Sequence, residues 1–384
     1  MNTGSTATTA KPQSPLVAFL RREKVLGAAL LSCLLVLLFE HPLTTGFANP
    51  FKLVAVLSWL FIIILATAIG VVRHAEALSS RLGEPFGTLV LTLSITGIEV
   101  LSITAVMLHG ENNPALVRDT LFSVVMIIMG GMVGISLLLG AFRHKELSFN
   151  LQGANAYLGV IIPLAVFSLV LPDFSRSSEG PTLSALQKAM VGLMAAGLYI
   201  IFLLIQTGRH RTFFSLPQVE GDAEELHEET EASPYPVGIS LLLLVCYIAP
   251  IVFLVETLAK PVDYIIETLH MPVAIGGVMM AILVTTPEGI GGVKAALANR
   301  LQQSVNIFLG SVLATIGLTV PIMLALSSAL GLDLVLGLAG IDVMMLILIF
   351  TVSIVTFSSG RTHVLQGAVH FLIFVAFLML LYRG

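Results

Sequence analysis

About eleven apolar stretches follow one another along this chain, each long enough to cross a lipid bilayer as a helix of roughly twenty residues. Of the 384 residues, 56% are hydrophobic and only 11% are charged. A soluble domain carries about 25% charged residues. The sequence therefore predicts an all-α polytopic membrane protein, and its 33 glycines fit closely packed helices better than a β-barrel.

The predicted membrane spans lie near residues 25–46, 50–72, 86–109, 114–141, 154–172, 186–207, 236–257, 271–293, 303–328, 334–357 and 362–382. We expect the helices around 114–141 and 271–300 to be interrupted. With the N-terminus inside, thirteen of the 19 Lys and Arg residues fall in inside segments. This excess matches the positive-inside rule, so the N-terminus is predicted to be cytoplasmic and the C-terminus external.

These spans divide the chain into two halves around a first helix. We predict a cytoplasmic N-terminal tail (1–24), a first transmembrane helix (25–47), a five-helix repeat (48–207), an acidic cytoplasmic loop (208–235) and a second five-helix repeat (236–384). An odd number of spans per half places the halves in opposite orientations. Inverted repeats of this kind are typical of secondary transporters.

The loop between the halves is strongly acidic. It includes Glu224, Glu225, Glu228 and Glu229, which stack at a spacing of four residues if the segment is helical. One interpretation is a solvated linker. The other is a regulatory element that attracts or senses cations, because crowded carboxylates favour bound cations.

One glutamate stands in a matched place in each half. Glu99 lies on the second span of the first half, in "LSITGIEVLSITAVM", and Glu288 lies on the second span of the other half, in "LVTTPEGIGGVKAAL". Ser123 follows Glu99 by 24 residues, and Ser311 follows Glu288 by 23. A carboxylate inside the membrane costs at least about 2.5–3.5 kcal/mol, so such residues are typically functional. We expect the two glutamates to meet near the middle of the bilayer.

The residues around these glutamates supply the oxygen ligands that hard cations prefer. The candidate cation- and proton-binding residues are Glu99, Glu288, Thr96, Thr285, Thr286, Ser123 and Ser311. Secondary candidates are Ser102, Asn306, Asp119 and Asp342. Glu99 and Glu288 would be the direct ligands of the ion. Asp119 could instead lie at a membrane edge beside Arg118, and Asp342 could be a structural partner or a residue of the proton path.

The segment "TTPEGIGG" has a second interpretation. Thr286 could cap a helix whose first residues are Pro287 and Glu288, because proline and an acidic residue favour a helix N-terminus. That helix would begin inside the membrane.

The stretch "PEGIGGVKAALANRLQQSVNIFLGSVLATIGLTVP" resembles the second repeat of the cation/calcium exchanger superfamily, most closely the calcium/proton antiporters of the ChaA type in bacteria. The glutamate, the pair Asn299–Arg300, the pair Gly310–Ser311 and the closing Pro321 are in the order of that family. The stretches "GEPFGTLVLTLSITGIEVLSITAVM" and "SSGRTHVLQGAVHFLIFVAF" resemble its first repeat and its last helix. The resemblance covers roughly residues 20–384.

The resemblance implies a secondary antiporter in a bacterial inner membrane. It would export Ca²⁺ in exchange for H⁺, with the two glutamates binding the cation and protons in turn. Many relatives carry Gly-Asn before each glutamate, where this chain reads "SITGIE" and "VTTPEG", so Na⁺ and K⁺ stay open beside Ca²⁺. A cation channel and a Na⁺-coupled cation exchanger are the alternatives.

Other classes find little support in the sequence. The chain has no HExxH motif, phosphate loop or protease-like pair of aspartates, so no enzyme activity is expected. Two cysteines in apolar runs give no disulfide framework, and no cofactor is implied. The expected partners are inorganic cations, protons and the lipid bilayer, with no nucleic acid. Assembly into a homo-oligomer stays open.

Overall fold

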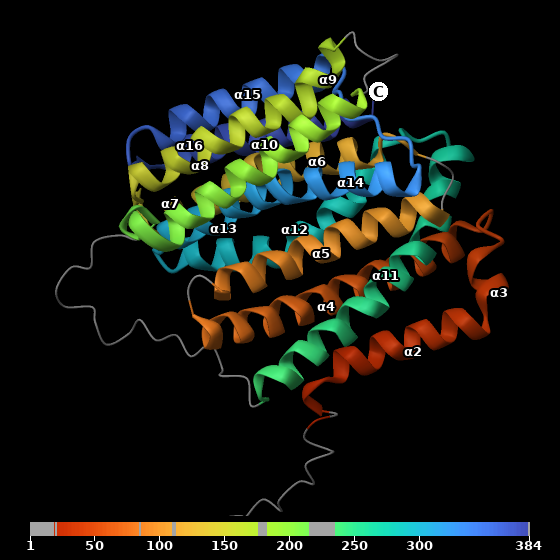
Figure 1. Ribbon diagram of the computed structural model, residues 1–384. Coiled ribbons are helices and arrows are strands. Elements are labelled where there is room, and N and C mark those ends of the chain that lie inside the picture. Colours follow the sequence, from red (N-terminus) through yellow and green to blue (C-terminus); the bar gives the residue numbers. More distant parts are fainter. Residues whose placement is uncertain are drawn as a thin grey trace, which may run out of the picture.

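The computed structural model describes residue 19 and residues 21–83, 86–109, 113–175, 183–214 and 235–382. Within these ranges, ten helices are long and apolar enough to span a membrane (Figure 1). Those of the first half are α4 (Pro50–Leu82), α5 (Phe86–His109), α6 (Leu116–Val125) with η1 (Met126–Met132) and α7 (Val133–His144), α8 (Leu151–Ala165) with η2 (Val166–Val170) and α9 (Leu171–Phe174), and α10 (Ala185–Leu204) with η3 (Ile205–Arg209).

Those of the second half are α11 (Val237–Glu267), α12 (Ala274–Leu297), α13 (Leu301–Ala314) with η5 (Thr315–Thr319) and α14 (Val320–Leu330), α15 (Gly340–Phe357), and α16 (Val364–Leu381). A short 3₁₀ turn, η4 (Arg211–Phe214), follows η3. Two strands, β1 (Leu147–Ser148) and β2 (Arg361–Thr362), pair antiparallel between two connecting segments. The predicted all-α membrane fold is confirmed.

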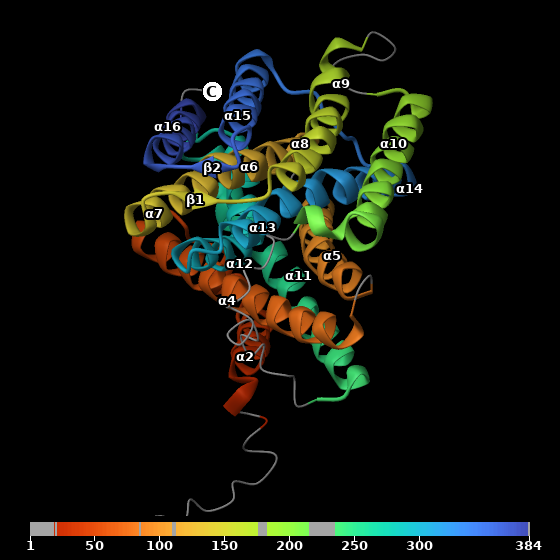
Figure 2. The same cartoon turned by 90° about the vertical axis from the view of Figure 1, so that its left-hand side faces the viewer.

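The first predicted span is shorter than expected. Helix α2 (Lys24–Leu38) has 15 residues, and after Phe39 the chain starts a separate short helix, α3 (Glu40–Thr44). Glu23, just before α2, fixes this helix to the bundle. Its Oε2 accepts hydrogen bonds from Arg73 on α4 (2.7 Å) and from Tyr247 on α11 (2.7 Å). Figure 2 shows α2 beside α4 and α11, with α15 and α16 at the opposite edge of the molecule.

The expected interruption of the helix around 114–141 is confirmed. The π-helical turn η1 lies between α6 and α7, and the turn η5 lies at the matching place between α13 and α14. Each turn has a glycine that faces an aromatic ring on the last helix of the other half. A Cβ at Gly131 would lie 3.3 Å from the Phe374 side chain on α16, and one at Gly317 would lie 3.0 Å from Tyr199 on α10.

The expected interruption around 271–300 is wrong. Helix α12 continues without a break from Ala274 to Leu297, with Pro287 inside it. Thr286 does not cap a helix there, because its hydroxyl donates to the carbonyl of Ile282 (2.6 Å). Proline removes one backbone donor, and in membrane helices neighbouring groups commonly compensate for that loss. Glu288 therefore projects from the middle of a helix.

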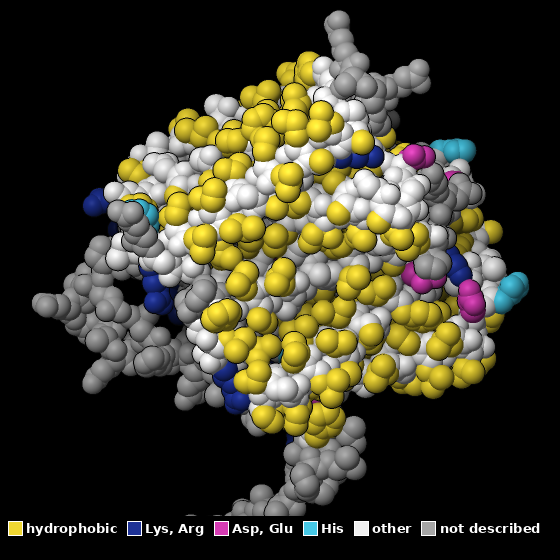
Figure 3. Space-filling view, viewed as in Figure 1, with side chains coloured by type: hydrophobic (Ala, Val, Ile, Leu, Met, Phe, Trp, Pro, Cys, Tyr) yellow, Lys and Arg dark blue, Asp and Glu magenta, His cyan; other side chains and the backbone are white. Residues whose placement is uncertain are grey.

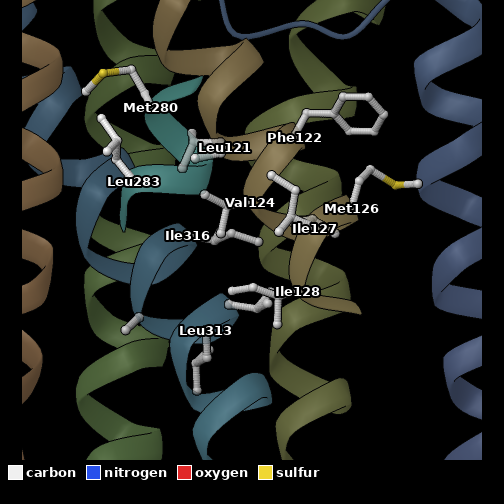
Figure 4. Close-up of a cluster of buried hydrophobic side chains, with 14 of the residues drawn as sticks. Leu121, Phe122, Val124, Met126, Ile127, Ile128, Met280, Leu283, Leu313 and Ile316 are labelled. Atoms are coloured by element: carbon white, nitrogen blue, oxygen red, sulfur yellow. The ribbon is translucent and has the colours of Figure 1, made fainter. Parts of the chain in front are cut away.

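A close-packed apolar core surrounds the two interrupted helices. Figure 4 shows side chains from α6 and η1 meeting those of α12, α13 and η5. Leu121, Val124, Ile128 and Ile316 are fully buried there. This core fixes the relative positions of the helices that carry the candidate site residues.

The surface of the bundle agrees with a membrane protein. Figure 3 shows hydrophobic side chains over the middle of the molecule, most Lys and Arg side chains toward the left-hand end, and most Asp, Glu and His side chains at the right-hand end. The end with more Lys and Arg is the predicted cytoplasmic end.

Candidate ion-binding site

Two carboxyl groups lie on adjacent helices inside the bundle. Glu99 projects from α5 and is 0% exposed, whereas Glu288 projects from α12 and is half-buried. Both side chains contact the same third helix, because Ser311 donates to Glu288 and Thr315 donates to Glu99. The expectation that matched glutamates of the two halves come together therefore agrees with the geometry.

A row of hydroxyl groups on a third helix connects these carboxyl groups. Ser311 on α13 donates a hydrogen bond to Glu288 Oε2. Thr315 and Thr319, on η5, donate to Glu99 Oε2 over 3.2 and 3.0 Å. The three hydroxyl residues follow one another at intervals of four, so they lie along one side of the helix. We call them the hydroxyl row.

The hydrogen bonds of Glu99 are incomplete. Its Oε1 is buried and has no hydrogen-bond partner among the described residues. A buried polar atom without a partner costs about 1–3 kcal/mol, and more if the group is charged. This oxygen is therefore a place where a proton or a cation would stabilise the protein.

A cavity of about 260 Å³ reaches Glu288 from one end of the bundle. We call it the Glu288 cavity. Beside Glu288, its lining includes Thr96, Ser311 and Thr315. Its lining extends to Glu76, toward the end of α4, and to Gln303, at the start of α13. These ends lie on the predicted cytoplasmic face. Glu99 does not line the cavity.

Two other candidates lie on the helices that carry this site. Asn306 lines the Glu288 cavity, but its amide is already engaged: it donates to the Phe214 carbonyl (2.7 Å) and accepts from Gln302 (2.9 Å). It ties α13 to the segment after α10. Ser102 is buried in α5, one turn after Glu99.

Thr285 and Thr286 hydrogen-bond within their own helix. Thr285 donates to the Ala281 carbonyl (2.7 Å), as Thr286 does to that of Ile282. Hydroxyls in apolar helices often bond to the backbone in this way. Both residues are close to Glu288 in the sequence, but no contact between them and its carboxyl group is found among the described residues.

Three candidates lie in a different place. Ser123, Asp119 and Asp342 line a separate cavity, which opens at the other end of the bundle. The four acidic-loop residues, Glu224, Glu225, Glu228 and Glu229, lie outside the described residues.

Thr319 is a residue that sequence reasoning missed. It is fully buried and donates to Glu99, which is 220 residues away in the chain. The one signal was its spacing of four residues from Thr315 in "TIGLT". Among the described residues, no group of three or more His, Cys, Asp or Glu side chains could hold a metal ion. The site thus offers two carboxylates and neutral oxygens.

A helical membrane bundle of two matched halves, with two carboxyl groups meeting inside it, has the architecture of a secondary transporter. The family model described as sodium/calcium exchanger protein matches residues 52–208 and 239–383. The chain belongs to this family of transporters.

Individual relatives agree with that assignment. A Sinorhizobium fredii protein named y4hA is 44% identical over 310 residues, which is 80% of this chain and 83% of that protein. The sodium-potassium/proton antiporter ChaA of Escherichia coli is 37% identical over 319 residues, covering 83% of this chain and 86% of the relative. The solved structure of native YfkE superposes with a TM-score of 0.72 at 16% identity, covering 94% of this chain and 99% of the other, which shows the shared fold.

Proposed function

We propose that this protein is an antiporter that exchanges an inorganic cation for protons, with Glu99 and Glu288 binding the two kinds of ion in turn. Its candidate cations are Ca²⁺, Na⁺ and K⁺. The observation that carries the proposal is the hydroxyl row, because it joins two intramembrane carboxyl groups into one site. The relatives named as cation/proton antiporters support the same class of activity.

Charge balance explains why the two kinds of ion would compete. Two carboxylates carry at most two negative charges, which one divalent cation, two monovalent cations or two protons would neutralise. An uncompensated charge inside the membrane is costly, so the empty, charged site is the least stable state. A protein that changes conformation only with a neutralised site exchanges one kind of ion for the other.

The Glu288 cavity supplies one access route. It reaches Glu288 from the predicted cytoplasmic end, while Glu99 stays sealed. We assign this arrangement to an inward-facing state. The long helices α4 and α11 pack closely, since a Cβ at Gly70 would collide with the Tyr247 ring, and α4 also lines the cavity. Sliding of this helix pair would close the route.

Transport by purified protein in liposomes tests the proposal. With an imposed pH gradient, adding Ca²⁺, Na⁺ or K⁺ to the wild type should change the lumenal pH for at least one of the three. Glu99→Gln and Glu288→Gln should each abolish this exchange. The control is Glu146→Gln, which removes an exposed carboxylate paired with Arg361 at 3.7 Å.

Exchange that continues at the wild-type rate in both glutamine variants would contradict the proposal. Cation flux without proton counterflow would indicate a channel instead.

A further inference from the structure

A second cavity contains three candidate residues that do not line the Glu288 cavity. Its volume is about 950 Å³, and it lies among the start of α6, the start of α12, the start of α15 and the end of α16. Asp119 and Ser123 on α6 and Asp342 on α15 line it. We call it the Asp342 cavity. It opens at the predicted external end, opposite the Glu288 cavity.

Among these residues, Ser123 gives the clearest indication of a binding site. It is only 2% exposed and lines the cavity, and no hydrogen bond of its hydroxyl is found within the described ranges. Thr120, on the same helix, donates to the Leu116 carbonyl (2.8 Å), as a hydroxyl in an apolar helix normally does. A buried hydroxyl that faces a cavity without a protein partner is available to a ligand or its water shell.

Two carboxylates extend the polar surface from Ser123 toward the outside. Asp119 precedes Ser123 by four residues, so both lie on one face of α6. Helix α12 holds this face in place, because a Cβ at Gly277 would lie 2.7 Å from the Asp119 Cβ. Asp342 approaches from α15 and makes no side-chain hydrogen bond within the described ranges.

One positive charge partly offsets these carboxylates. Arg118 Nε donates to Asp119 Oδ1 (2.8 Å), and its Nη1 donates to the Gly337 carbonyl (3.2 Å). Arg118 is thereby held against the segment before α15. The group of three charged side chains has a net charge of −1, and a cavity with low-dielectric walls strengthens the attraction of such a charge for cations.

The matching residues of the other half lack these charges, and Glu76, the acidic residue that lines the Glu288 cavity beside Glu288, comes from α4 instead. Ser123 and Ser311 occupy matching places, and each lines one of the two cavities. In the same register, Arg118 and Asp119 correspond to Asn306 and Ile307, which line the Glu288 cavity. The Glu288 cavity has neutral side chains where the Asp342 cavity has ionic ones.

We propose that Asp119, Ser123 and Asp342 form a second, external cation site, at which the transported cation is held with part of its water shell. The cation would occupy it after leaving Glu99 and Glu288, or before reaching them in the reverse direction. This inference rests on the proposed function.

Exchange in vesicles of defined sidedness tests the external site. Right-side-out and inside-out vesicles present Ca²⁺, Na⁺ or K⁺ to one face at a time. An impermeant maleimide on Asp333→Cys, in the exposed segment before α15, identifies the external face. In Asp342→Asn the half-maximal cation concentration should rise about fivefold on that face, the effect of removing one charge about 4 Å away in water. It should stay the same on the opposite face.

The matched control is Asp333→Asn, which removes an equal charge from the same end but does not line the cavity. A second variant, Ser123→Ala, leaves the charge of the cavity unchanged. It should raise the half-maximal cation concentration on the external face by less than Asp342→Asn does. Raising the ionic strength with choline chloride should reduce the difference in half-maximal cation concentration between Asp342→Asn and the wild type, because salt screens exposed charges.

Three results would overturn the external site. The half-maximal cation concentration could shift equally on both faces, it could shift in neither Asp342→Asn nor Ser123→Ala, or it could shift as much in Asp333→Asn. If the wild type exchanges cations for protons and Asp342→Asn has the wild-type half-maximal cation concentration on both faces, only the external site is refuted. Wild-type protein without any cation/proton exchange would refute the proposed function.

Discussion

Glu99 and Glu288 hold matching places in the two halves, yet their surroundings differ. Glu99 is fully buried, with two threonine hydroxyls on one oxygen and no partner on the other among the described residues. Glu288 faces a cavity and accepts one hydrogen bond from Ser311. Two acids at matching places in the sequence thus differ in access, because Glu288 lines the Glu288 cavity and Glu99 does not.

The neighbouring residues reinforce this difference. Gly289 and Gly292 follow Glu288, where Val100 and Ile103 follow Glu99. A Cβ at Gly292 would collide with the Phe308 ring, and one at Gly289 would lie 2.7 Å from Met132. Helix α12 therefore approaches α13 and η1 more closely than larger side chains would permit.

The largest effect is expected at the sealed carboxyl group. The double variant Thr315→Val/Thr319→Val removes both hydrogen-bond donors that Glu99 has among the described residues, and Glu99 itself does not line the Glu288 cavity, so water is less able to replace them. Exchange in liposomes should fall about 100-fold, because each hydrogen bond to a charged group contributes about 1.5–3 kcal/mol. The control Thr315→Ser/Thr319→Ser keeps the hydroxyls and should retain most of the activity. A double valine variant with wild-type exchange would show that these contacts are incidental.

A smaller loss is expected at the open carboxyl group. Ser311→Ala removes the one donor to the Glu288 carboxyl group found within the described part of the chain, but water in the cavity can take its place. Exchange should fall about tenfold, in line with one hydrogen bond to a charged group. Initial rates in liposomes measure the loss. If Ser311→Ala is more damaging than the double valine variant, the contrast between a sealed and an open carboxyl group is wrong.

The sequence predicted only part of this contrast between the two glutamates. Apolar stretches predicted the spans, and the rarity of intramembrane carboxylates identified Glu99 and Glu288. The contact of Glu99 with Thr319 joins residues 220 apart and depends on the π-helical turn η5, which no hydrophobic pattern reveals. Matching spacing also grouped Ser123 with Ser311, although the packing of the halves places them in different cavities. Pro287 predicted a break that α12 does not have.

The next prediction concerns the close approach of α12. Gly292→Ala should lower the free energy of unfolding by about 1–3 kcal/mol, because the added methyl group overlaps the Phe308 ring. The neighbouring variant Gly291→Ala is the control, since its Cβ would lie 3.8 Å from Ile307, an ordinary contact. Thermal unfolding in detergent compares the two. Equal Tm values would show that α12 has room to move away from α13.

The smallest effect is expected for a carboxylate outside the spans. Lys260 donates a hydrogen bond to Glu40 (2.8 Å), and this bond with its charge lowers the pKa of Glu40. A lowered folded-state pKa stabilises the protein above the unfolded value of about 4.3, and the contribution is lost as the pH falls through the folded-state pKa. Glu40→Gln should therefore lower Tm slightly at pH 7, less than Gly292→Ala does, and leave Tm unchanged at the acid limit. A difference that grows toward acid pH would contradict this sign.

Proton release from purified protein tests the competition at the two glutamates most directly. Weakly buffered wild-type protein in detergent should release protons when Ca²⁺, Na⁺ or K⁺ is added and binds, and a pH indicator dye measures the release. The double variant Glu99→Gln/Glu288→Gln should release none, while Glu146→Gln should behave as the wild type. Cation binding by the wild type without proton release, or undiminished release from the double variant, would contradict the shared site.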